Sequence, residues 1–356
     1  MSTDAYARSG VDQHAADRAV AALVGVLRTI DAGRASRSVL ASGHYAAVLE
    51  VAPNLGIAVG TDGVGSKLIL AEQTGRYDTV GIDCVAMNVN DVVCVGAEPI
   101  ALLDYLAVER ADPDVMRAIG EGLKRGAELA GVEIPGGEVA ILPELIRGHP
   151  SPNGFDLTAT CFGTVALDAI VTGDAIAPGD ALIGVPSSGL HSNSYTLARR
   201  AVEGLDLDSP FENGTLADAL LEPTTIYVRA ALELLRTGEV HGLAHITGGG
   251  LRNLLRLNDD VGFTIDDPLP APPIIELVKQ RGEVSDAEAW EVFNMGCGFV
   301  AVVPEARAEE ATSILAAHHA GGRRIGTVTD AAGTVTVPGR YSSGHGSRSA
   351  SPSSGG

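Results

Sequence analysis

The stretch GTDGVGSK, residues 60–67, nearly matches the phosphate-binding pattern G-x-x-x-x-G-K-[ST], but here Ser66 comes before Lys67. Asp62 lies inside the stretch, where its carboxylate would repel a bare phosphate. A carboxylate beside phosphates usually indicates Mg²⁺ between them. The residues alone are compatible with a plain turn between a strand and a helix, or with a nucleotide site that differs from a P-loop.

Glycines make this stretch a candidate binding loop, because they allow tight turns and a close approach of backbone to ligand. If a helix begins near Ser66, its free N–H groups face an anion, and Lys67 adds a point charge. The candidate ligand contacts are Gly60, Thr61, Asp62, Gly63, Gly65, Ser66 and Lys67.

Length and composition bound the class of protein. The chain has 356 residues, which predicts two domains, and 45% of them are hydrophobic. No apolar run reaches the ~18 residues that span a bilayer, and the N-terminus lacks an apolar signal core. We expect a cytoplasmic protein without membrane contact. Buried reduced thiols are expected for Cys84, Cys94, Cys161 and Cys297, which form no C-x-x-C pair.

The formal net charge of −20 argues against nucleic-acid binding, since no basic face is visible. Only three residues are lysine, and arginine supplies the remaining basic groups. An acidic surface is tolerated at high salt, where self-repulsion is screened, whereas GC-rich coding alone explains arginine in place of lysine. We hypothesise a halophilic host; full stability and activity in dilute buffer would contradict this.

Periodicity predicts alternating helices and strands. The N-terminal half reads as helices at 13–30, 81–99 and 113–130 and strands at 55–60, 100–108 and 155–167. The C-terminal half reads as strands at 181–185 and 243–246, a loop at 187–194, and helices at 195–203, 215–236 and 251–257. We place an N-terminal domain at 1–168, a C-terminal domain at 169–340 and a disordered Ser/Gly-rich tail at 341–356.

Three further acidic residues are candidates for a magnesium or nucleotide site. Asp91 stands beside Asn90 before an apolar run, where an ionised carboxylate is costly unless paired or metal-bound. Asp83 begins the same segment, as a site residue or as a helix cap. Glu138 follows Gly137 in a glycine pair that suits a turn, and it is either a further ligand or a solvent-facing glutamate.

Polar and glycine-rich loops in the second half are typical of anion recognition. Residues 186–195 supply Ser188, His191 and Asn193 after an apolar strand, and residues 292–300 supply Asn294. Before a predicted helix, residues 244–255 supply His245, Thr247, Gly248 and Gly249. Each histidine taken alone is more often structural than catalytic. Taken together, the carboxylates, Lys67 and these loops favour Mg²⁺-ATP chemistry on a phosphorylated substrate.

These motifs occur in a fixed order: GTDGVGSK, GIDCVAMNVNDVVCVGAEP, GGEVAILPE, SSGLHSNSY, AHITGGG and FNMGCGF. The set resembles the phosphoribosylformylglycinamidine cyclo-ligase family, also called AIR synthetase, over about residues 10–338. The segment 43–51 resembles the shorter N-terminal form of archaeal members. The resemblance implies a two-domain α/β (α+β) fold, in which an N-terminal α/β domain builds a barrel across a homodimer interface beside a C-terminal α+β domain.

The resemblance also implies the reaction and its ligands. ATP would phosphorylate the formyl amide oxygen of phosphoribosylformylglycinamidine (FGAM), and an amidine nitrogen would close the ring to aminoimidazole ribonucleotide (AIR). Mg²⁺ would be held by Asp62, Asp91 and Glu138, while a K⁺ requirement stays open. Lys67 would stabilise the transferring phosphoryl group, and His191 and His245 would transfer protons or contact phosphate.

The chain departs from the family pattern at Val139, Ile141 and Leu142, where many relatives carry polar residues. Related families remain as alternatives. A selenophosphate synthetase needs a reactive N-terminal cysteine, and the hydrogenase-maturation dehydratase ends in one; this chain has neither. A thiamine-monophosphate kinase would not need the HITGGG segment, and the FGAM-forming amidotransferase is longer. A non-catalytic nucleotide-binding relative would have lost the carboxylates that are present here.

Overall fold

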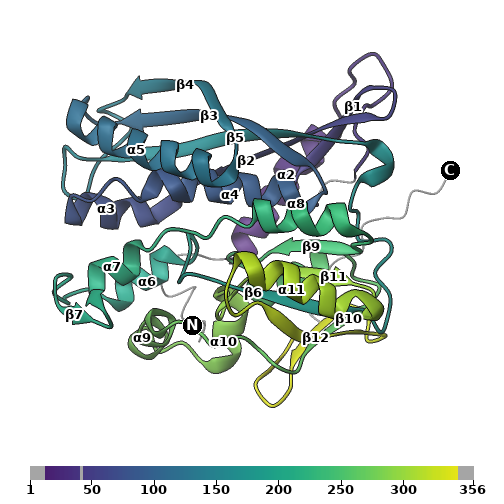
Figure 1. The fold of residues 1–356 in the computed structure, drawn as a ribbon. Coiled ribbons are helices and arrows are strands. Elements are labelled where there is room, and N and C mark those ends of the chain that lie inside the picture. The colour runs from purple at the N-terminus through teal and green to yellow at the C-terminus, as the bar shows by residue number, and fades with distance from the viewer. Residues whose placement is uncertain (1–12, 41–42, 344–356) are drawn as a thin grey trace.

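The computed structural model describes residues 13–40 and 43–343, which build two β-sheets with helices packed on them (Figure 1). The N-terminal sheet has five strands in the order β1-β2-β5-β3-β4, and a second sheet has seven in the order β14-β13-β10-β12-β6-β11-β9. Helix α4 (Val80–Cys94) lies between the sheets and contacts β2, β5 and β9. This arrangement confirms the predicted two-part mixed α/β fold.

The N-terminal sheet shows the alternation expected of a sheet covered on one face. Along β5, every second side chain from Phe155 to Val165 is buried on the face covered by α4, and those between are more exposed. The bounds of this half are β1 Ala47–Ala52, β2 Leu55–Gly63, α3 Leu68–Thr74, β3 Glu98–Val108, α5 Pro113–Ala130, β4 Glu133–Ile141 and β5 Phe155–Val165, with a 3₁₀ turn at Gly65–Lys67.

The predicted helices and strands of this half are confirmed, with two corrections. The strand expected to end at Gly60 continues to Gly63, so Asp62 belongs to the end of β2 and not to a loop. The expected turn at Gly136 and Gly137 is wrong, because both lie within β4. A Cβ at Gly137 would stand 2.3 Å from the carboxylate of Asp104, so this glycine makes room for a neighbouring strand's side chain.

Helix α5 begins where the sequence predicted. The Asp112 side chain accepts hydrogen bonds from the backbone N–H groups of Asp114 and Val115, and Pro113 occupies the first turn. Glycines let α5 approach α4 closely, since a Cβ on Gly81 would come within 2.2 Å of the Leu123 nitrogen. This tight contact fixes α4, which carries several candidate site residues.

The C-terminal sheet consists of short strands flanked by short helices. Its strands are β6 Ala181–Pro186, β9 Gly242–His245, β10 Gly262–Ile265, β11 Cys297–Val303, β12 Arg323–Thr329, β13 Thr334–Val337 and β14 Tyr341–Ser342. A small hairpin joins β7 Pro210–Phe211 to β8 Gly214–Thr215. The helices are α6 Tyr195–Ala201, α7 Leu216–Leu221, α8 Val228–Thr237, α9 Pro273–Arg281, α10 Asp286–Val292 and α11 Ala308–His318, with 3₁₀ turns at Leu167–Ala169, Gly250–Arg256 and Glu305–Arg307.

Three predictions for this half need correction. The helix expected at 215–236 is divided into α7 and α8 by residues 222–227, which we call the strap. The segment expected as a helix at 251–257 is a 3₁₀ helix from Gly250 to Arg256. Tyr341 and Ser342, expected in the disordered tail, form β14 and pair with β13, whereas residues 344–356 lie outside the described part of the chain.

All four cysteines are buried and unpaired, as predicted. Burial raises the pKa of the Cys161 and Cys297 thiols to about 12, so they stay protonated at neutral pH. Among the described residues, no helix is long and apolar enough to cross a lipid bilayer.

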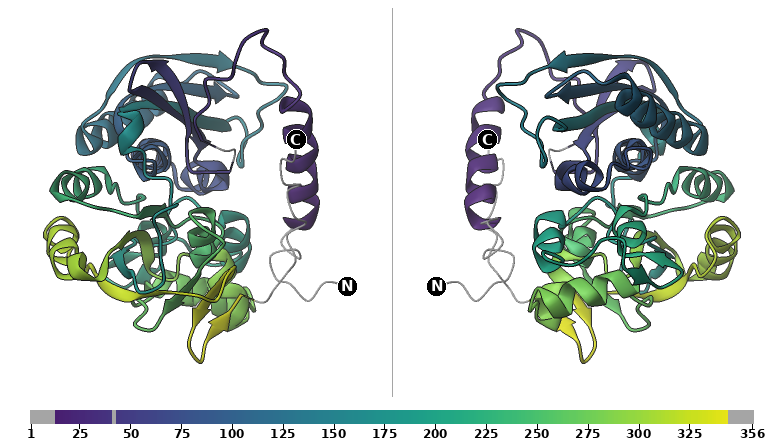
Figure 2. Two further views of the ribbon diagram at one scale, coloured as in Figure 1. Left: turned by 90° about the vertical axis from the view of Figure 1, so that its right-hand side faces the viewer. Right: turned by 90° about the vertical axis from the view of Figure 1, so that its left-hand side faces the viewer.

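Helix α2 (Gln13–Leu27) confirms the predicted N-terminal helix but stands away from the rest of the chain, on the side opposite α8 and α11 (Figures 1 and 2). Its apolar side chains Val20, Leu23 and Leu27 are at least half exposed. Their helical spacing therefore predicted the helix correctly, but they do not join the core of this chain.

A histidine between two carboxylates makes the stability of the C-terminal sheet depend on pH. His241 Nδ1 lies 2.6 Å from Asp180 Oδ2, and its Nε2 lies 3.0 Å from Glu239 Oε1. Burial alone would lower the pKa of His241, but these hydrogen bonds and charges raise it. The contribution of protonated His241 to stability is fully present below the ordinary histidine pKa of about 6.5. It is lost as the pH rises through the raised pKa that His241 has in the folded protein.

We expect His241→Gln to lower the free energy of unfolding by on the order of 1 kcal/mol at pH 5.5, and by less at pH 8.5. Urea unfolding of both proteins at the two pH values measures this difference. His318→Gln, which removes a more exposed histidine paired with Glu233, is the control and should change stability less. An equal loss at both pH values would contradict the prediction.

Candidate active site

The centre of the candidate site is a hydrogen bond between the two halves of the chain. Asp91, on the last turn of α4, has its Oδ1 atom 2.8 Å from Nδ1 of His245, the final residue of β9. His245 is fully buried, whereas the Asp91 side chain keeps 18% exposure. Because a carboxylate only accepts, Nδ1 of His245 carries the hydrogen, and a neutral ring leaves Nε2 as an acceptor. That Nε2 atom is buried and has no hydrogen-bond partner.

Asp62 joins this pair from the end of β2. The amide of Asn88, one turn before Asp91 on α4, bonds to both the N–H and the C=O of Asp62, each at 3.0 Å, and so ties the strand to the helix. Asp62 stays reachable by solvent, but partial desolvation raises its pKa and the nearby Asp91 charge adds to this effect. Two carboxylates whose charges oppose each other suit a cation between them.

The loop after β6 brings a second histidine towards His245. Nε2 of His191 accepts the backbone N–H of Ser188 at 3.3 Å, so the hydrogen of the neutral ring is on Nδ1. The ring centroids of His191 and His245 are 6.5 Å apart. Burial, with the charges of His245 and Lys67, holds the pKa of His191 well below its usual value, so the ring is neutral. The backbone of His191 adopts φ 61°, a costly conformation for a non-glycine residue that is common at functional sites.

Four buried polar atoms of this region have no partner among the described residues: His191 Nδ1, Ser192 Oγ, Asn193 Nδ2 and His245 Nε2. Three of them are donors and the fourth is an acceptor. Leaving such atoms unpaired in the interior costs about 1–3 kcal/mol each, so ligand groups or water normally satisfy them. The set fits a ligand that presents oxygen acceptors to the loop and a proton to His245.

The glycine loop after β9 lies against the same loop. A Cβ on Gly248 would stand 3.5 Å from Oδ1 of Asn193, so the two predicted anion loops are neighbours. Asn253 holds the glycine loop, since its Oδ1 accepts the Thr247 N–H at 2.8 Å and the Thr247 hydroxyl at 3.3 Å. A Cβ on Gly249 would come within 2.8 Å of the Asn253 amide, which explains the need for glycine there.

Lys67 and Asp83, both predicted as site residues, are paired with each other in the interior. Both are 0% exposed and form an ion pair of 2.8 Å. Lys67 Nζ also donates to the carbonyls of His191, at 3.1 Å, and Glu222, at 2.7 Å, which uses all three of its hydrogens. Asp83 accepts from the N–H and the hydroxyl of Thr224 at 2.8 and 2.6 Å, and it does not cap α4. Together they lock α4 and the 3₁₀ turn to the His191 loop.

Asn90 and Asn294 also hold backbone instead of a ligand. Asn90 donates to the carbonyl of Thr225 and accepts from the Tyr227 N–H, both at 2.9 Å, so its amide is held by the strap. Asn294 donates to the carbonyl of Gly189 at 2.8 Å and accepts from the Ser187 hydroxyl at 3.0 Å. Ser188 directs its hydroxyl to the carbonyl of Pro223 at 2.6 Å. These residues position the His191 loop.

Glu138 does not meet Asp62 and Asp91 within one chain. Glu138 is exposed, and on β4 it lies opposite Tyr105 of the neighbouring strand β3. Tyr105 lies opposite Thr158 on β5, and Thr158 lies opposite Gly63 on β2. Paired residues share a face, so Glu138 and Gly63 point to the outer face, whereas Asp62, one residue earlier, points to the helix-covered face. Among the described residues, no group of three or more His, Cys, Asp and Glu side chains could hold a metal ion.

The remaining residues of the opening stretch shape the backbone. Thr61 lies on the outer face and donates its hydroxyl to the carbonyl of Ala159. Gly60 packs on Val92 of α4, and Gly65 has φ 73° with open space around it. The hydroxyl of Ser66 lies 3.3 Å from that of Thr196.

Arg256 is a neighbour of the site that sequence reasoning missed. Its guanidinium lies 4.1 Å from the centroid of the Tyr45 ring and donates to the carbonyls of Gly43 and His44. The positive charge of Arg256 also opposes the rise in the pKa of Asp62 that desolvation causes. No local motif marks Arg256, because its partners lie more than 200 residues earlier in the chain.

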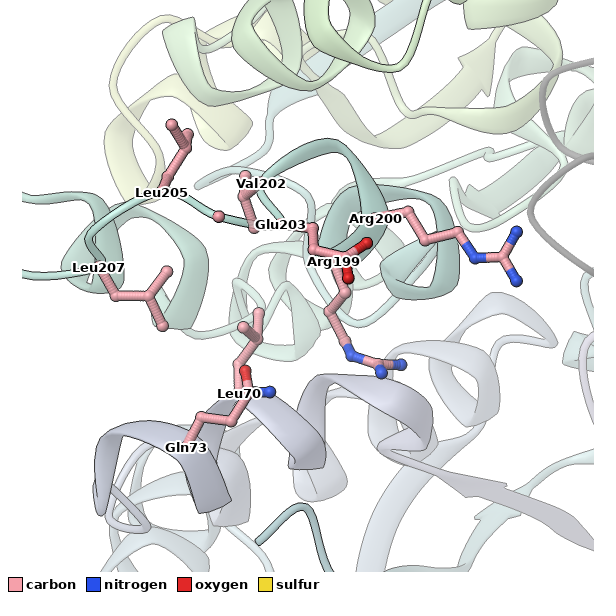
Figure 3. Close-up of a pocket in the computed structure, with 9 residues that line it drawn as sticks. Leu70, Gln73, Arg199, Arg200, Val202, Glu203, Leu205 and Leu207 are labelled. Carbon is pink, nitrogen blue, oxygen red and sulfur yellow. The ribbon is translucent and has the colours of Figure 1, made fainter.

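A hollow of about 430 Å³ between α3 and the loop after α6 contains none of the predicted site residues. Figure 3 shows Arg199 and Arg200 extending away from the side formed by Leu205 and Leu207. Partial burial lowers the pKa of Arg199, and the charge of Glu72 opposes this shift. The candidate site is therefore the Asp62–Asp91–His245–His191 group and not this hollow.

Comparison with known proteins agrees with this geometry. Residues 43–165 match the family "AIR synthase related protein, N-terminal domain", and residues 177–338 match the corresponding C-terminal domain. The phosphoribosylformylglycinamidine cyclo-ligase of Thermococcus gammatolerans is 48% identical over 87% of this chain and 91% of its own length. That of Methanothermobacter thermautotrophicus is 47% identical over 93% and 96%.

Solved structures share the fold at lower identity. Thiamine-monophosphate kinase from Stenotrophomonas maltophilia is 21% identical, with a TM-score of 0.61 over 85% of this chain and 92% of that one. The E. coli hydrogenase maturation protein HypE is 20% identical, with a TM-score of 0.58 over 80% and 82%. Since both domain families match and the cyclo-ligases align over nearly their whole length, the chain belongs to the phosphoribosylformylglycinamidine cyclo-ligase family of AIR synthase related enzymes.

Proposed function

We propose that this protein catalyses the ATP-dependent cyclisation of FGAM to AIR, a step of purine biosynthesis. Family membership supports the activity, and the Asp91–His245 pair of 2.8 Å between the two halves of the chain is the observation that carries the site. In the reaction, the γ-phosphoryl group of ATP moves to the formyl oxygen of FGAM and ADP is formed. The amidine nitrogen then attacks the formyl carbon that carries the phosphorylated oxygen. The nitrogen loses a proton, and the bond from carbon to that oxygen breaks as phosphate leaves.

The unpaired atoms of the site match these demands. His191 Nδ1–H, the Ser192 hydroxyl and the Asn193 amide are donors that would hold phosphate or formyl oxygens. His245 Nε2 is an acceptor that would receive the proton of the attacking amidine nitrogen. Asp91, bonded to the opposite ring nitrogen, fixes the tautomer and stabilises the imidazolium that forms. Holding both ends of FGAM in the site would set the geometry for ring closure.

Mg²⁺ fits the carboxylates of Asp62 and Asp91, because this ion is usually bound through one or two carboxylates together with substrate phosphates. When bound, it would offset negative charge on the transferring phosphoryl group. The raised pKa of Asp62 supports this proposal, since the two carboxylates disfavour each other without a cation. Glu138 would not belong to the same metal site within one chain.

The direct test is an assay of ATP hydrolysis that depends on FGAM, with chemical detection of the aminoimidazole product in high KCl. We expect ADP and AIR in equal amounts, and no product when either substrate is omitted. Thiamine monophosphate is the comparison substrate, because a kinase shares the fold. Turnover with thiamine monophosphate and none with FGAM would contradict the proposal.

We propose that the outer face of the N-terminal sheet forms a homodimer interface. It exposes Leu103 (47%) and Tyr105 (41%) on β3, and Leu49 (40%) lies on the edge strand β1. A barrel closed across two copies would cover these side chains and the edges of the sheet.

We expect Leu103→Glu/Tyr105→Glu to elute as a monomer while the parent chain elutes as a dimer. The control Leu145→Glu, in an exposed loop, should not change the mass measured by light scattering. A monomeric parent chain would contradict the proposal.

A further inference from the structure

A second hollow, of about 550 Å³, is lined by residues of α5, α8, α11 and the strap, which come from both halves of the chain. Figure 1 labels these three helices. The hollow begins at Thr79, beside the first turn of α4, whereas Asp91 is twelve residues further along the same helix. At 1.5 Å per residue, this corresponds to about 18 Å along the helix axis. The hollow is therefore distant from Asp91 along α4, and it approaches the candidate site only at Ser188, which lines the hollow and donates its N–H to His191.

Two arginines, Arg125 from α5 and Arg229 from α8, line this hollow without a carboxylate partner. Arg125 has no hydrogen-bond or ion-pair partner in the described part of the chain. Arg229, from α8, donates to the backbone carbonyl of Glu128 at 2.7 Å, which places its guanidinium within one turn of Arg125. By contrast, Arg76, Arg323 and Arg324 of this acidic chain form carboxylate pairs. Two neighbouring guanidinium groups without a carboxylate partner suit a phosphate.

The other walls suit the remainder of a nucleotide. Ile82, Leu129 and Ile226 are apolar and would contact a planar base. Asp78, whose backbone lies against α5, and Glu222 supply acceptors to which ribose hydroxyls would donate. The Oγ1 atom of Thr79 is buried and has no partner among the described residues. Burial and the neighbouring His318 lower the pKa of His319 to about 4, so this imidazole lines the hollow as a neutral ring.

We propose that this hollow binds a nucleoside monophosphate, with its phosphate on Arg125 and Arg229. The size is right, since ligand pockets usually have volumes of about 300–1,000 Å³. Neither the family membership nor the proposed cyclisation assigns a ligand to this place.

The strap connects the hollow to the candidate active site. Residues 222–226 line the hollow, and the same backbone holds Lys67, Ser188, Asp83 and Asn90 through the hydrogen bonds described above. Ser188 in turn donates its N–H to His191. A ligand that favours one position of the strap therefore shifts the position of His191. This coupling rests on the proposed function, whereas binding itself does not.

Calorimetric binding of AMP tests the proposal, with the catalytic site saturated by a non-hydrolysable ATP analogue. We expect one AMP per chain, retained in Asp91→Asn, and a dissociation constant at least about tenfold higher in Arg125→Gln/Arg229→Gln. Leu129→Trp, which would fill the mouth of the hollow, should also abolish binding. Arg117→Gln, on the exposed face of α5, is the matched control and should bind AMP as the parent chain does.

Adenosine and inorganic phosphate separate the parts of the ligand, and each should bind more weakly than AMP. Absence of AMP binding, or equal binding by the parent chain and the double-arginine variant, would overturn the proposal. Inorganic phosphate as tight as AMP would overturn the assignment of a nucleotide. In the cyclisation assay, AMP should change kcat/KM in the parent chain but not in the double-arginine variant. An inactive protein that still binds AMP would refute the proposed function while leaving this site intact.

Discussion

Asp91→Asn is expected to lower kcat/KM for FGAM-dependent turnover by about 10³-fold or more, because the substitution removes two contributions at once. The amide can no longer fix the hydrogen of His245 on Nδ1 through a charged acceptor, since Asn can offer its NH₂ group instead. It also removes one of the two carboxylates that suit Mg²⁺. Steady-state rates at saturating ATP, measured over a range of Mg²⁺ concentrations, check the result.

Asp168→Asn is the matched control, because Asp168 is exposed in the connection between the two sheets and has no partner near the site. It should retain the parent rate within about twofold, as surface substitutions usually do. The mass in solution and the melting temperature of Asp91→Asn should stay close to those of the parent chain, since the Asp91 side chain is partly exposed. Retained activity in Asp91→Asn would move the catalytic site elsewhere.

Lys67→Met should lower the free energy of unfolding by about 3–5 kcal/mol, the cost of leaving one buried charge without its partner. The Lys67 ammonium is 0% exposed and balances Asp83, which is equally buried. Burial lowers the pKa of Lys67, and the charge of Asp83 opposes this shift, so the pair persists because each member neutralises the other. Chemical denaturation monitored by circular dichroism measures the loss.

Lys124→Met is the matched control, since Lys124 is exposed and its carboxylate partners lie 3.9–4.0 Å away. It should change stability by less than about 0.5 kcal/mol. The double variant Lys67→Met/Asp83→Asn removes both charges and keeps an acceptor for Thr224, so it should recover part of the loss even if Lys67→Met alone does not fold. Equal stability of Lys67→Met and Lys124→Met would contradict a structural role for the buried pair.

The sequence alone predicted most elements of the N-terminal half, because their signals are local. Asp112 and Pro113 mark the start of α5, and the alternation along residues 155–165 reflects a strand with one covered face. It also indicated Asp62, Asp91, His191 and His245 as candidates for one site, since polar residues in apolar surroundings require a partner. Which of them would meet was not determined by these local patterns.

Tertiary structure decided the partners, because pairing depends on contacts between residues far apart in the chain. Asp91 meets His245 across 154 residues, and Lys67 meets Glu222 across 155, which turns a predicted phosphate ligand into an internal brace. Within one chain, Glu138 does not join Asp62 and Asp91, for a geometric reason. Side chains alternate along a strand, so a shift of one position in strand register moves a carboxylate to the opposite face of the sheet. The sequence thus determined which residues need partners, and the packing of α4 between the two sheets determined which partners they have.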